Sequence, residues 1–362
     1  PIEFESRIIV LLWMVETLAL FFIGRKFQIA VFEVLAYLLL FILGLVLAGH
    51  WGNTYYSWEL KPFPALWNLE LLTSLLLLAG TITLLFLHRR FQTSKEIPSL
   101  NMVINCLPAA LLYLAFFHEI YHAFDLEAAR PSGAFGQKDS VLIFRNLWLF
   151  VYTFGALALA AEVNARRWKS KDLELFIAYI GLLCIALFLA TQLTELNHLR
   201  RLFLSHGTSA APWFILIRYV SYGMLGWLYF HVHQSLQSNE SLKSCRPQIP
   251  LLLHFLLLLV LSNELATVWL FLLGTPDSHL PYRVGFSILW GLYSFLLIGL
   301  GFRKKSQTLR VAGMVLFAVT LVKIFFFDLV NLSILSRTVL FLALGALLLG
   351  ASYLYQRFKE RE

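Results

Sequence analysis

Residues 118–122 read HEIYH, which places His118 and His122 four residues apart with Glu119 between them. Positions i and i+4 share one face of a helix, so two histidines at this spacing can hold a zinc ion while the glutamate acts as a base. No third ligand can be assigned, and the motif lies where an apolar stretch ends. We therefore predict no metal and no other cofactor, and interpret His118 and His122 as interfacial histidines.

Carboxylates recur near the last turns of other apolar stretches, as Glu195, Glu264 and Asp328. Glu264 comes about sixteen residues into its stretch, roughly 24 Å from the start of the helix. An acid at the centre of a membrane helix costs about 2.5 to 3.5 kcal/mol, so it needs water, a partner or a ligand. A hydrogen bond between helices, worth about 1 kcal/mol, is an equally good structural interpretation.

Lys323 and Asp328 raise the same question within LVKIFFFDLV. On a helix they lie about 7.5 Å apart along the axis and about 140° around it, so they do not share a face. We expect Lys323 to pair with a buried carboxylate from another helix or to extend to the outer interface, and Asp328 to lie at the outer mouth. The predicted polar cavity consists of His118, Glu119, His122, Glu195, Asn263, Glu264, Lys323 and Asp328. No catalytic residue is assigned.

The amino-acid composition indicates that lipid, rather than water, surrounds the helices that carry these groups. The chain has 362 residues, of which 59% are hydrophobic and 14% charged, whereas a soluble domain is about half apolar and about a quarter charged. We predict an all-α, polytopic membrane helix bundle, in which the net charge of +8 is no sign of nucleic-acid binding. Phosphate-loop, dinucleotide-binding and nucleophile-elbow motifs are absent from the sequence, which argues against ATP hydrolysis and dinucleotide chemistry.

Hydropathy predicts about eleven membrane-spanning helices, each near the roughly 20 residues that a bilayer requires. They are 7–24, 28–49, 65–87, 99–122, 141–165, 173–196, 211–233, 248–273, 282–302, 308–328 and 335–356. Most Lys and Arg residues follow the odd-numbered spans or lie in the C-terminal tail. The positive-inside rule therefore places those loops and the C-terminus in the cytoplasm. The chain begins PIEFESR without Met, and we expect an upstream region.

The sequence repeats itself weakly, since LWMVETLALFFIGRKFQ (12–28) is similar to LWGLYSFLLIGLGFRKKSQ (289–307). Both combine Leu-Trp, an apolar helix, Gly and a basic turn. We predict a single transmembrane domain, 1–362, that is built from parallel helical hairpins. The hairpins would be 7–50, 65–122, 141–197, 211–273 and 282–330, followed by a closing helix at 335–356.

The segments ILWGLYSFLLIGLGFRKKSQTLRVAGM, LVKIFFFDL and SRTVLFLALGALLLGASYLYQRF carry a likeness to a known family. Over residues 284–358 the chain resembles the bacterial predicted membrane proteins known as domain of unknown function twenty-three thirty-nine. This resemblance implies many helices in a bacterial inner membrane and a role in the cell envelope. It implies no activity and no catalytic residue.

Three classes of function fit these observations. The first is handling or transport of a lipid, glycan or similar amphiphile through an outward-facing polar cavity, which we prefer because the polar groups are dispersed. The second is an outer-face membrane transferase with a carboxylate base, and the third is a non-catalytic scaffold subunit of an envelope complex. The sequence does not decide whether the chain is an enzyme. The expected partners are membrane lipids, with envelope proteins as a further class, and no nucleic acid.

Overall fold

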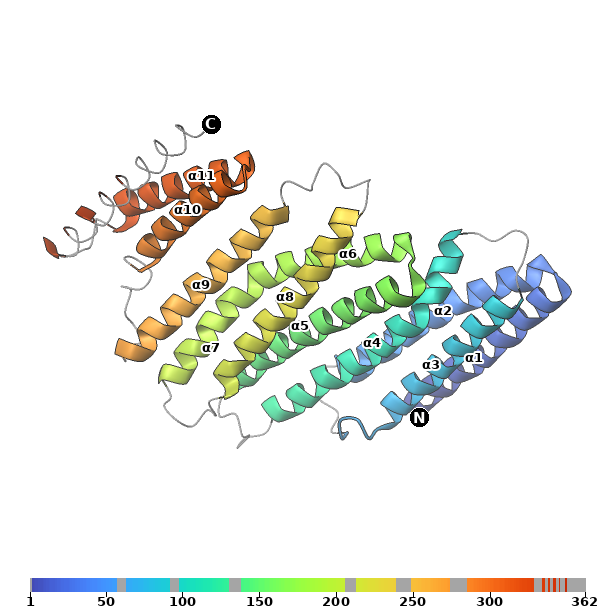
Figure 1. Cartoon of the computed structure of the whole chain (residues 1–362). Helices are drawn as coiled ribbons and strands as arrows, with labels where there is room; N and C mark the ends of the chain where they lie inside the picture. The colour runs from blue at the N-terminus through green and yellow to red at the C-terminus, as the bar shows by residue number, and fades with distance from the viewer. Residues whose placement is uncertain are drawn as a thin grey trace. The chain divides into compact units, whose positions relative to one another are not determined.

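The structure is a computed structural model that describes residues 2–56, 63–91, 98–129, 138–205, 213–238, 249–273 and 285–328, with a few single positions between 334 and 349. Within these ranges the secondary structure is entirely helical (Figure 1). The predicted all-α fold is therefore confirmed. Short π-helical turns, labelled η, interrupt or end several of the helices.

The first half of the chain forms α1 (Ile2–Phe27), α2 (Ala30–Tyr55), α3 (Leu69–Arg90), α4 (Pro98–Ala128), α5 (Lys138–Val163) and η1 (Asn164–Trp168). The second half forms α6 (Lys171–Leu187), η2 (Phe188–Gln192), α7 (Leu193–Ser205), α8 (Trp213–Ser238), α9 (Ile249–Leu273), α10 (Phe286–Arg303), α11 (Gln307–Lys323) and η6 (Ile324–Asp328).

Among the described residues, nine helical segments are long and apolar enough to cross a membrane. They are 7–27, 30–55, 69–90, 100–128, 140–168, 173–191, 249–269, 286–303 and 307–327. Nine of the eleven predicted spans correspond to them. The predicted span at 211–233 corresponds to α8, which is long enough but carries Arg218, His231 and His233. Most of the span predicted at 335–356 falls outside the described residues.

The helices pack as two compact units. Unit 1 comprises residues 1–179 and 209–224, and unit 2 comprises residues 180–208 and 225–362. In unit 1, α1 packs against α2 and α3, while α4 packs between α3 and α5. In unit 2, α10 packs against α11, and α9 contacts α7, α10 and α11.

The cores of unit 1 are apolar layers between the first four helices. One contains Val10, Met14, Leu43, Leu47 and Leu77, and another contains Phe21, Ala36, Leu84 and Ile104. Helices α1 and α3 approach closely at Gly80. A methyl group at this position would lie only 2.6 Å from the Met14 side chain. Small residues at such crossings are the usual means by which membrane helices pack without a hydrophobic driving force.

The α1–α2 and α10–α11 hairpins turn in the same way. After α1, the N–H of Ile29 donates to the carbonyl of Gly24 at 2.9 Å, and Gln28 has φ 56°. After α10, the N–H of Ser306 donates to the carbonyl of Gly301 at 2.9 Å, and Lys305 has φ 51°. This six-to-one bond beside a left-handed residue is the Schellman ending of a helix.

The glycine in each of these turns allows the following helix to pack closely against the preceding one. A methyl group on Gly24 would lie 2.8 Å from the backbone nitrogen of Glu33, and one on Gly301 would lie 2.7 Å from that of Arg310. The two stretches that look alike in sequence therefore form like turns. The wider arrangement of five hairpin repeats in a single domain stays a prediction.

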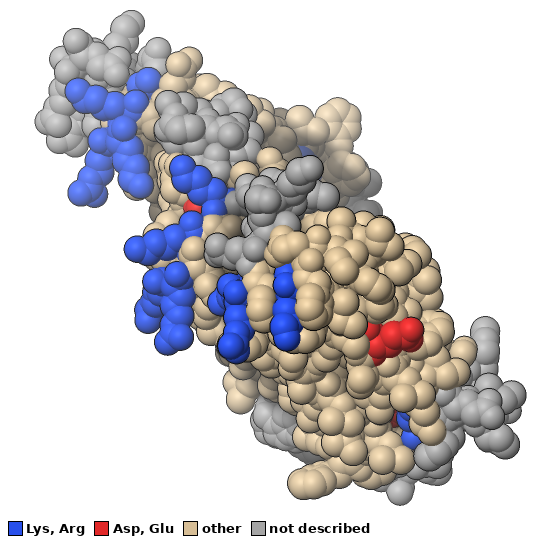
Figure 2. Space-filling view, turned by 90° about the vertical axis from the view of Figure 1, so that its right-hand side faces the viewer, with Lys and Arg blue, Asp and Glu red and all other residues tan. Residues whose placement is uncertain are grey.

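The two ends of unit 1 differ in charge. Arg25, Arg89 and Arg166 lie where α1, α3 and η1 end, and we call this the basic end. The other end, where α2 and α4 finish and α3 begins, is called the opposite end. Figure 2 shows Lys and Arg side chains exposed on the face that it presents.

Candidate functional site

The HEIYH sequence forms the last turns of α4, within the candidate span 100–128, at the opposite end of unit 1. His118, Glu119 and His122 are all buried, with Glu119 only 1% exposed. They pack against the end of α2 and against the segment 63–68, which leads into α3. The structure therefore brings together three of the predicted site residues.

Both oxygens of the Glu119 carboxylate accept hydrogen bonds from the protein. The hydroxyl of Tyr55 donates to Oε1 at 2.7 Å, and the backbone N–H of Leu66 donates to Oε2 at 2.8 Å. The side-chain amide of Asn68 donates to both oxygens, at 3.0 and 2.9 Å. Such a carboxylate has no free lone pair directed at a substrate, which argues against the base role that an H-E-x-x-H motif would require.

The sequence around α3 explains how these donors are positioned. Leu66 has φ 67°, a left-handed conformation that turns the chain where its N–H meets Glu119. Asn68 is the N-cap of α3, because its side-chain oxygen accepts from the N–H of Leu71 at 2.6 Å. One asparagine thus begins α3 and ties that helix to α4.

The two histidines of the motif contact different groups. The ring of His118 is stacked on Tyr55 with centroids 5.1 Å apart and lies 4.7 Å from the Trp51 ring. The ring of His122 is stacked on Phe63 with centroids 3.8 Å apart, and its Nε2 lies 3.3 Å from the Phe63 carbonyl oxygen. In the described part of the chain, no group of three or more His, Cys, Asp and Glu side chains is placed to hold a metal ion.

One edge of His118 is distinctive. Its Nδ1 lies 3.0 Å from the hydroxyl of Tyr56, and its buried Nε2 has no hydrogen-bond partner among the described residues. Burial is the main cause that raises the pKa of Tyr56 to about 12, and the nearby Tyr121 adds to it. The Tyr56 hydroxyl therefore keeps its proton and can donate to Nδ1 of His118. When it does, a neutral His118 carries its own proton on Nε2.

A second buried carboxylate lies nearby at Glu70, in the first turn of α3. Arg7 of α1 pairs with it at 2.5 Å, and Nε2 of His50 in α2 lies 2.6 Å from it. Sequence reasoning missed Glu70 and Arg7. The positions of Glu70 and His50 in the sequence were a usable signal, because Glu70 lies near the start of the predicted span 65–87 and His50 directly follows the predicted span 28–49.

In unit 2, the polar candidates lie on facing helices. Arg200 of α7, which sequence reasoning also missed, is buried and donates to the carbonyl of Asn263 at 3.3 Å and to Thr267 at 3.0 Å. Glu195 lies on α7, and Glu264 lies on α9 beside Asn263. This arrangement joins α7 to α9 through a cation and neutral acceptors.

Lys323 contacts a buried residue of another helix, and this residue is a serine rather than a carboxylate. Its ammonium group donates to the hydroxyl of Ser287, at the start of α10, at 2.7 Å. One turn later on α10, the indole N–H of Trp290 donates to Ser262 of α9 at 2.9 Å. These bonds link α9, α10 and α11, and we call Ser262, Asn263, Ser287, Trp290 and Lys323 the polar layer of unit 2.

The candidate residues thus fall into two sets. His118, Glu119 and His122 belong to unit 1, and Glu195, Asn263, Glu264 and Lys323 belong to unit 2. The side chain of Asp328 lies outside the described residues. That all eight line one cavity stays a prediction.

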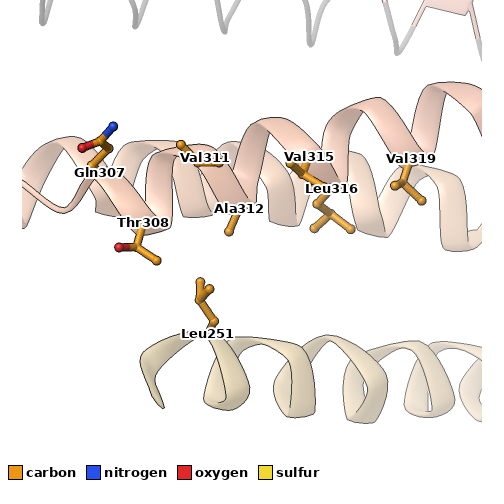
Figure 3. A pocket seen from close by; sticks show the side chains of 8 residues that line it. All are labelled: Leu251, Gln307, Thr308, Val311, Ala312, Val315, Leu316 and Val319. Carbon is orange, nitrogen blue, oxygen red and sulfur yellow. The ribbon is translucent and has the colours of Figure 1, made fainter. Parts of the chain in front are cut away.

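Unit 2 also contains an open groove of about 610 Å³ between α9 and α11 (Figure 3). Its lining residues are Leu251, Gln307, Thr308, Val311, Ala312, Val315, Leu316 and Val319. Polar side chains occur only where α11 begins, and the remainder is aliphatic. The three valines are half exposed, and Val315 is 57% exposed, so the groove is an apolar surface that is open to the surroundings.

Helix geometry places Lys323 on the face of α11 that lines the groove. At about 100° per residue, it lies within about 20° of Ala312 and of Leu316 around the axis. It comes one turn after Val319, the last lining residue. The groove therefore runs from Gln307 and Thr308, beside a basic turn, to a lysine in the polar layer.

The family described as "Predicted membrane protein (DUF2339)" matches residues 1–358 of the chain. Neither the curated proteins nor the solved structures include a match to this chain.

Proposed function

Since the chain belongs to the predicted membrane protein family DUF2339, and has nine candidate spans in its described part, we propose that it handles or transports an amphiphile of the bacterial cell envelope. The amphiphile is a lipid or a lipid-linked glycan. The observation that carries this proposal is the groove between α9 and α11, which is aliphatic beyond Gln307 and Thr308 and ends one helical turn before Lys323.

The groove has the dimensions of a lipid chain. Its lining extends over thirteen residues of α11, from Gln307 to Val319, which places the first and last about 18 Å apart at 1.5 Å per residue. A pocket for a small organic molecule has a volume of about 300 to 1,000 Å³, and the groove falls within that range. The exposed valines give it a wall that matches an extended acyl chain in polarity.

Apolar contact alone would not retain a particular lipid here. Lipid tails are as apolar as leucine, so a chain gains little by leaving the bilayer for an apolar groove. Selectivity must therefore come from the polar part of the ligand. Lys323 and the hydroxyl groups of the polar layer are placed to provide it, because they lie at the end of the groove on three different helices.

The charge of Lys323 favours an anionic headgroup. Its ammonium group donates a hydrogen bond to the hydroxyl of Ser287. A phosphate or carboxylate accepts charge-assisted hydrogen bonds from an ammonium group, and these are stronger than bonds between neutral groups. We therefore propose an anionic lipid or an anionic lipid-linked glycan as the ligand class.

The transferase alternative receives less support. It requires a carboxylate that can accept a proton from a substrate, and Glu119 has both oxygens occupied by Tyr55, Leu66 and Asn68. A scaffold role would leave the groove to a protein helix rather than to a lipid. The experiment below distinguishes these occupants.

The proposal also includes orientation. We propose that the protein lies in the bacterial inner membrane with its basic loops and C-terminus in the cytoplasm, as the positive-inside rule predicts. In this orientation the beginning of α11 faces the cytoplasm and Lys323 lies in the outer half of the membrane. The headgroup end of the ligand would then face outward.

The test compares two phenylalanine substitutions on α11. Ala312→Phe fills the groove, whereas Val322→Phe changes an exposed residue that does not line it. The full chain is titrated with phosphatidylglycerol in detergent, and bound lipids are counted by native mass spectrometry. We expect Ala312→Phe to weaken one binding event by about tenfold, which corresponds to about 1.4 kcal/mol, and Val322→Phe to leave it unchanged. Equal binding by the parent and by both variants would contradict the proposal.

The headgroup is tested separately. Lys323→Met removes the charge but keeps most of the stem, and Lys304→Met is the matched change in the exposed basic turn. We expect Lys323→Met to reduce the preference for phosphatidylglycerol over phosphatidylcholine, and Lys304→Met to preserve that preference. A preference that survives Lys323→Met would show that the headgroup is bound elsewhere.

A further inference from the structure

A second concave site lies at the basic end of unit 1, separate from the groove. It has a volume of about 480 Å³ and is formed by α3, α4, η1 and the beginning of α6. Its lining residues are Arg89, Asn101, Met102, Asn105, Cys106, Arg167, Trp168, Ser170 and Leu173. Polar and apolar side chains contribute in similar measure, and none of these described lining residues is acidic.

The two arginines of this basic-end pocket come from distant parts of the sequence and are held in place differently. Arg89 ends α3 and donates to the side-chain oxygen of Asn105 at 3.2 Å. The amide of Asn105 in turn donates to the carbonyl of Asn101 at 2.7 Å. The orientation of the Arg89 guanidinium is therefore set by α4, which forms one wall of the pocket.

Arg167 lies in a turn that is fixed by its own hydrogen bonds. The N–H of Lys169 donates to the carbonyl of Asn164 at 2.7 Å, and Lys169 has φ 51°. The Asn164 side chain donates to the carbonyl of Ser170 at 2.9 Å and accepts from its N–H at 3.1 Å. This turn presents Arg167 and Trp168 to the same pocket without help from other helices.

We propose that this pocket binds the phosphate group of an anionic phospholipid. Two guanidinium groups without a lining carboxylate suit a phosphate, because the planar fork of arginine matches its oxygens with paired hydrogen bonds. Basic pockets between helices at the membrane surface bind phospholipid headgroups by this means. The amides of Asn101 and Asn105 supply donors for ester or glycerol oxygens.

The apolar lining explains why a lipid fits better than a free anion. Met102 and Leu173 give the pocket a hydrophobic wall, along which the first carbons of an acyl chain can lie. Trp168 is 45% exposed, as is usual for tryptophan at the level of the headgroups. Inorganic phosphate shares the charge but gains nothing from this wall.

Cys106 provides a direct probe, since it lines the pocket. In a Cys184→Ser/Cys245→Ser background it is the remaining thiol of the chain. Its rate of reaction with a maleimide is measured on the full chain in detergent, alone and with phosphatidylglycerol, with phosphatidylcholine of the same chains, or with inorganic phosphate. We expect phosphatidylglycerol to slow the reaction several-fold and phosphatidylcholine to have little effect. Slowing by inorganic phosphate to the same extent would identify the phosphate group alone as the ligand.

The matched variants remove the same charge from neighbouring positions. Arg89→Gln/Arg167→Gln changes the pocket, whereas Arg90→Gln/Arg166→Gln changes exposed arginines outside it. We expect the first pair to abolish the protection of Cys106 and the second pair to preserve it, with protection measured in each variant as the ratio of its own rates without and with lipid. Equal protection by the two lipids, or protection that survives the first pair, would overturn the proposal. Ala312→Phe in the groove should leave the protection intact, which separates this site from the proposed function.

Discussion

The opposite end of unit 1 and the groove of unit 2 use their polar groups in contrasting ways. Around Glu119, the carboxylate oxygens accept bonds from Tyr55 at the end of α2 and from Leu66 and Asn68 in the segment before α3, and the carboxylate is buried. In the groove, half-exposed valines of α11 extend to Val319, one helical turn before Lys323, which donates to the hydroxyl of Ser287. A satisfied buried network fixes a structure, whereas an open apolar surface that ends in a charge is suited to a ligand.

This contrast changes the meaning of the H-E-x-x-H spacing. In unit 1 the glutamate joins α2, α3 and α4, so the residue that looks most catalytic in sequence is a structural one. In unit 2 the lysine that looks merely out of place lies at the end of a groove. In this chain a sequence motif is therefore a weaker guide to a functional site than the hydrogen bonds of each buried polar atom.

The largest expected effect concerns Glu119. Replacing it with alanine leaves the hydroxyl of Tyr55, the amide of Asn68 and the N–H of Leu66 buried without their acceptor. Each unsatisfied donor costs about 1 to 3 kcal/mol, so we expect Glu119→Ala to lower the free energy of unfolding by about 3 to 5 kcal/mol. Thermal unfolding in detergent, followed by tryptophan fluorescence, measures this loss.

The control for Glu119 is Lys304, a charged residue that is exposed in the turn between α10 and α11, outside the candidate spans. Lys304→Ala should change the stability by no more than about 0.5 kcal/mol, as is usual for exposed positions. If both alanine variants unfold at the temperature of the parent, the Glu119 network is not structural and the contrast between the two regions is lost.

A smaller effect tests the hairpin turns. A methyl group at Gly301 would lie 2.7 Å from the backbone nitrogen of Arg310, whereas one at Gly299 would have open space around it. We expect Gly301→Ala to destabilise by about 1 to 3 kcal/mol because α10 and α11 must separate. Gly299→Ala should instead stabilise by up to about 1 kcal/mol through helix propensity. The same sign for both substitutions would contradict the close approach at Gly301.

The smallest expected effect concerns His118. Its Nε2 already lacks a protein partner among the described residues, so His118→Phe keeps the ring contacts and loses only the bond to Tyr56. We expect a loss of about 1 kcal/mol or less. His50→Phe should cost more, because Glu70 loses a partner in a buried pair. Unfolding curves in which the two phenylalanine variants shift equally would show that His118 is as structural as His50.

Much of the fold follows from hydropathy alone. Nine predicted spans correspond to long apolar helices, and the likeness between GRKF and GFRKKS marks two turns that share a Schellman ending. Both signals are local, since they depend on the length of an apolar run and on a glycine that precedes basic residues. The sequence also indicated that Lys323 has a buried partner, because its cost in a membrane requires one.

The pairings between helices could not be predicted in this way. Glu70, Arg7 and Arg200 were missed because hydropathy does not indicate which face of one helix meets another. The donors to Glu119 depend on the left-handed turn at Leu66, which no glycine or proline marks at that position. The groove was also missed, since its lining residues read as an ordinary membrane helix.

The central claim is that the α9–α11 groove holds the apolar chain of an amphiphile. The most direct test uses an anionic phospholipid with a photoreactive group near the end of its acyl chain, reconstituted with the full protein and mapped by mass spectrometry. The account predicts cross-links concentrated on Leu251, Val311 and Val315, and lost in Ala312→Phe. Cross-links spread evenly over exposed positions such as Val322, with no change in Ala312→Phe, would contradict it.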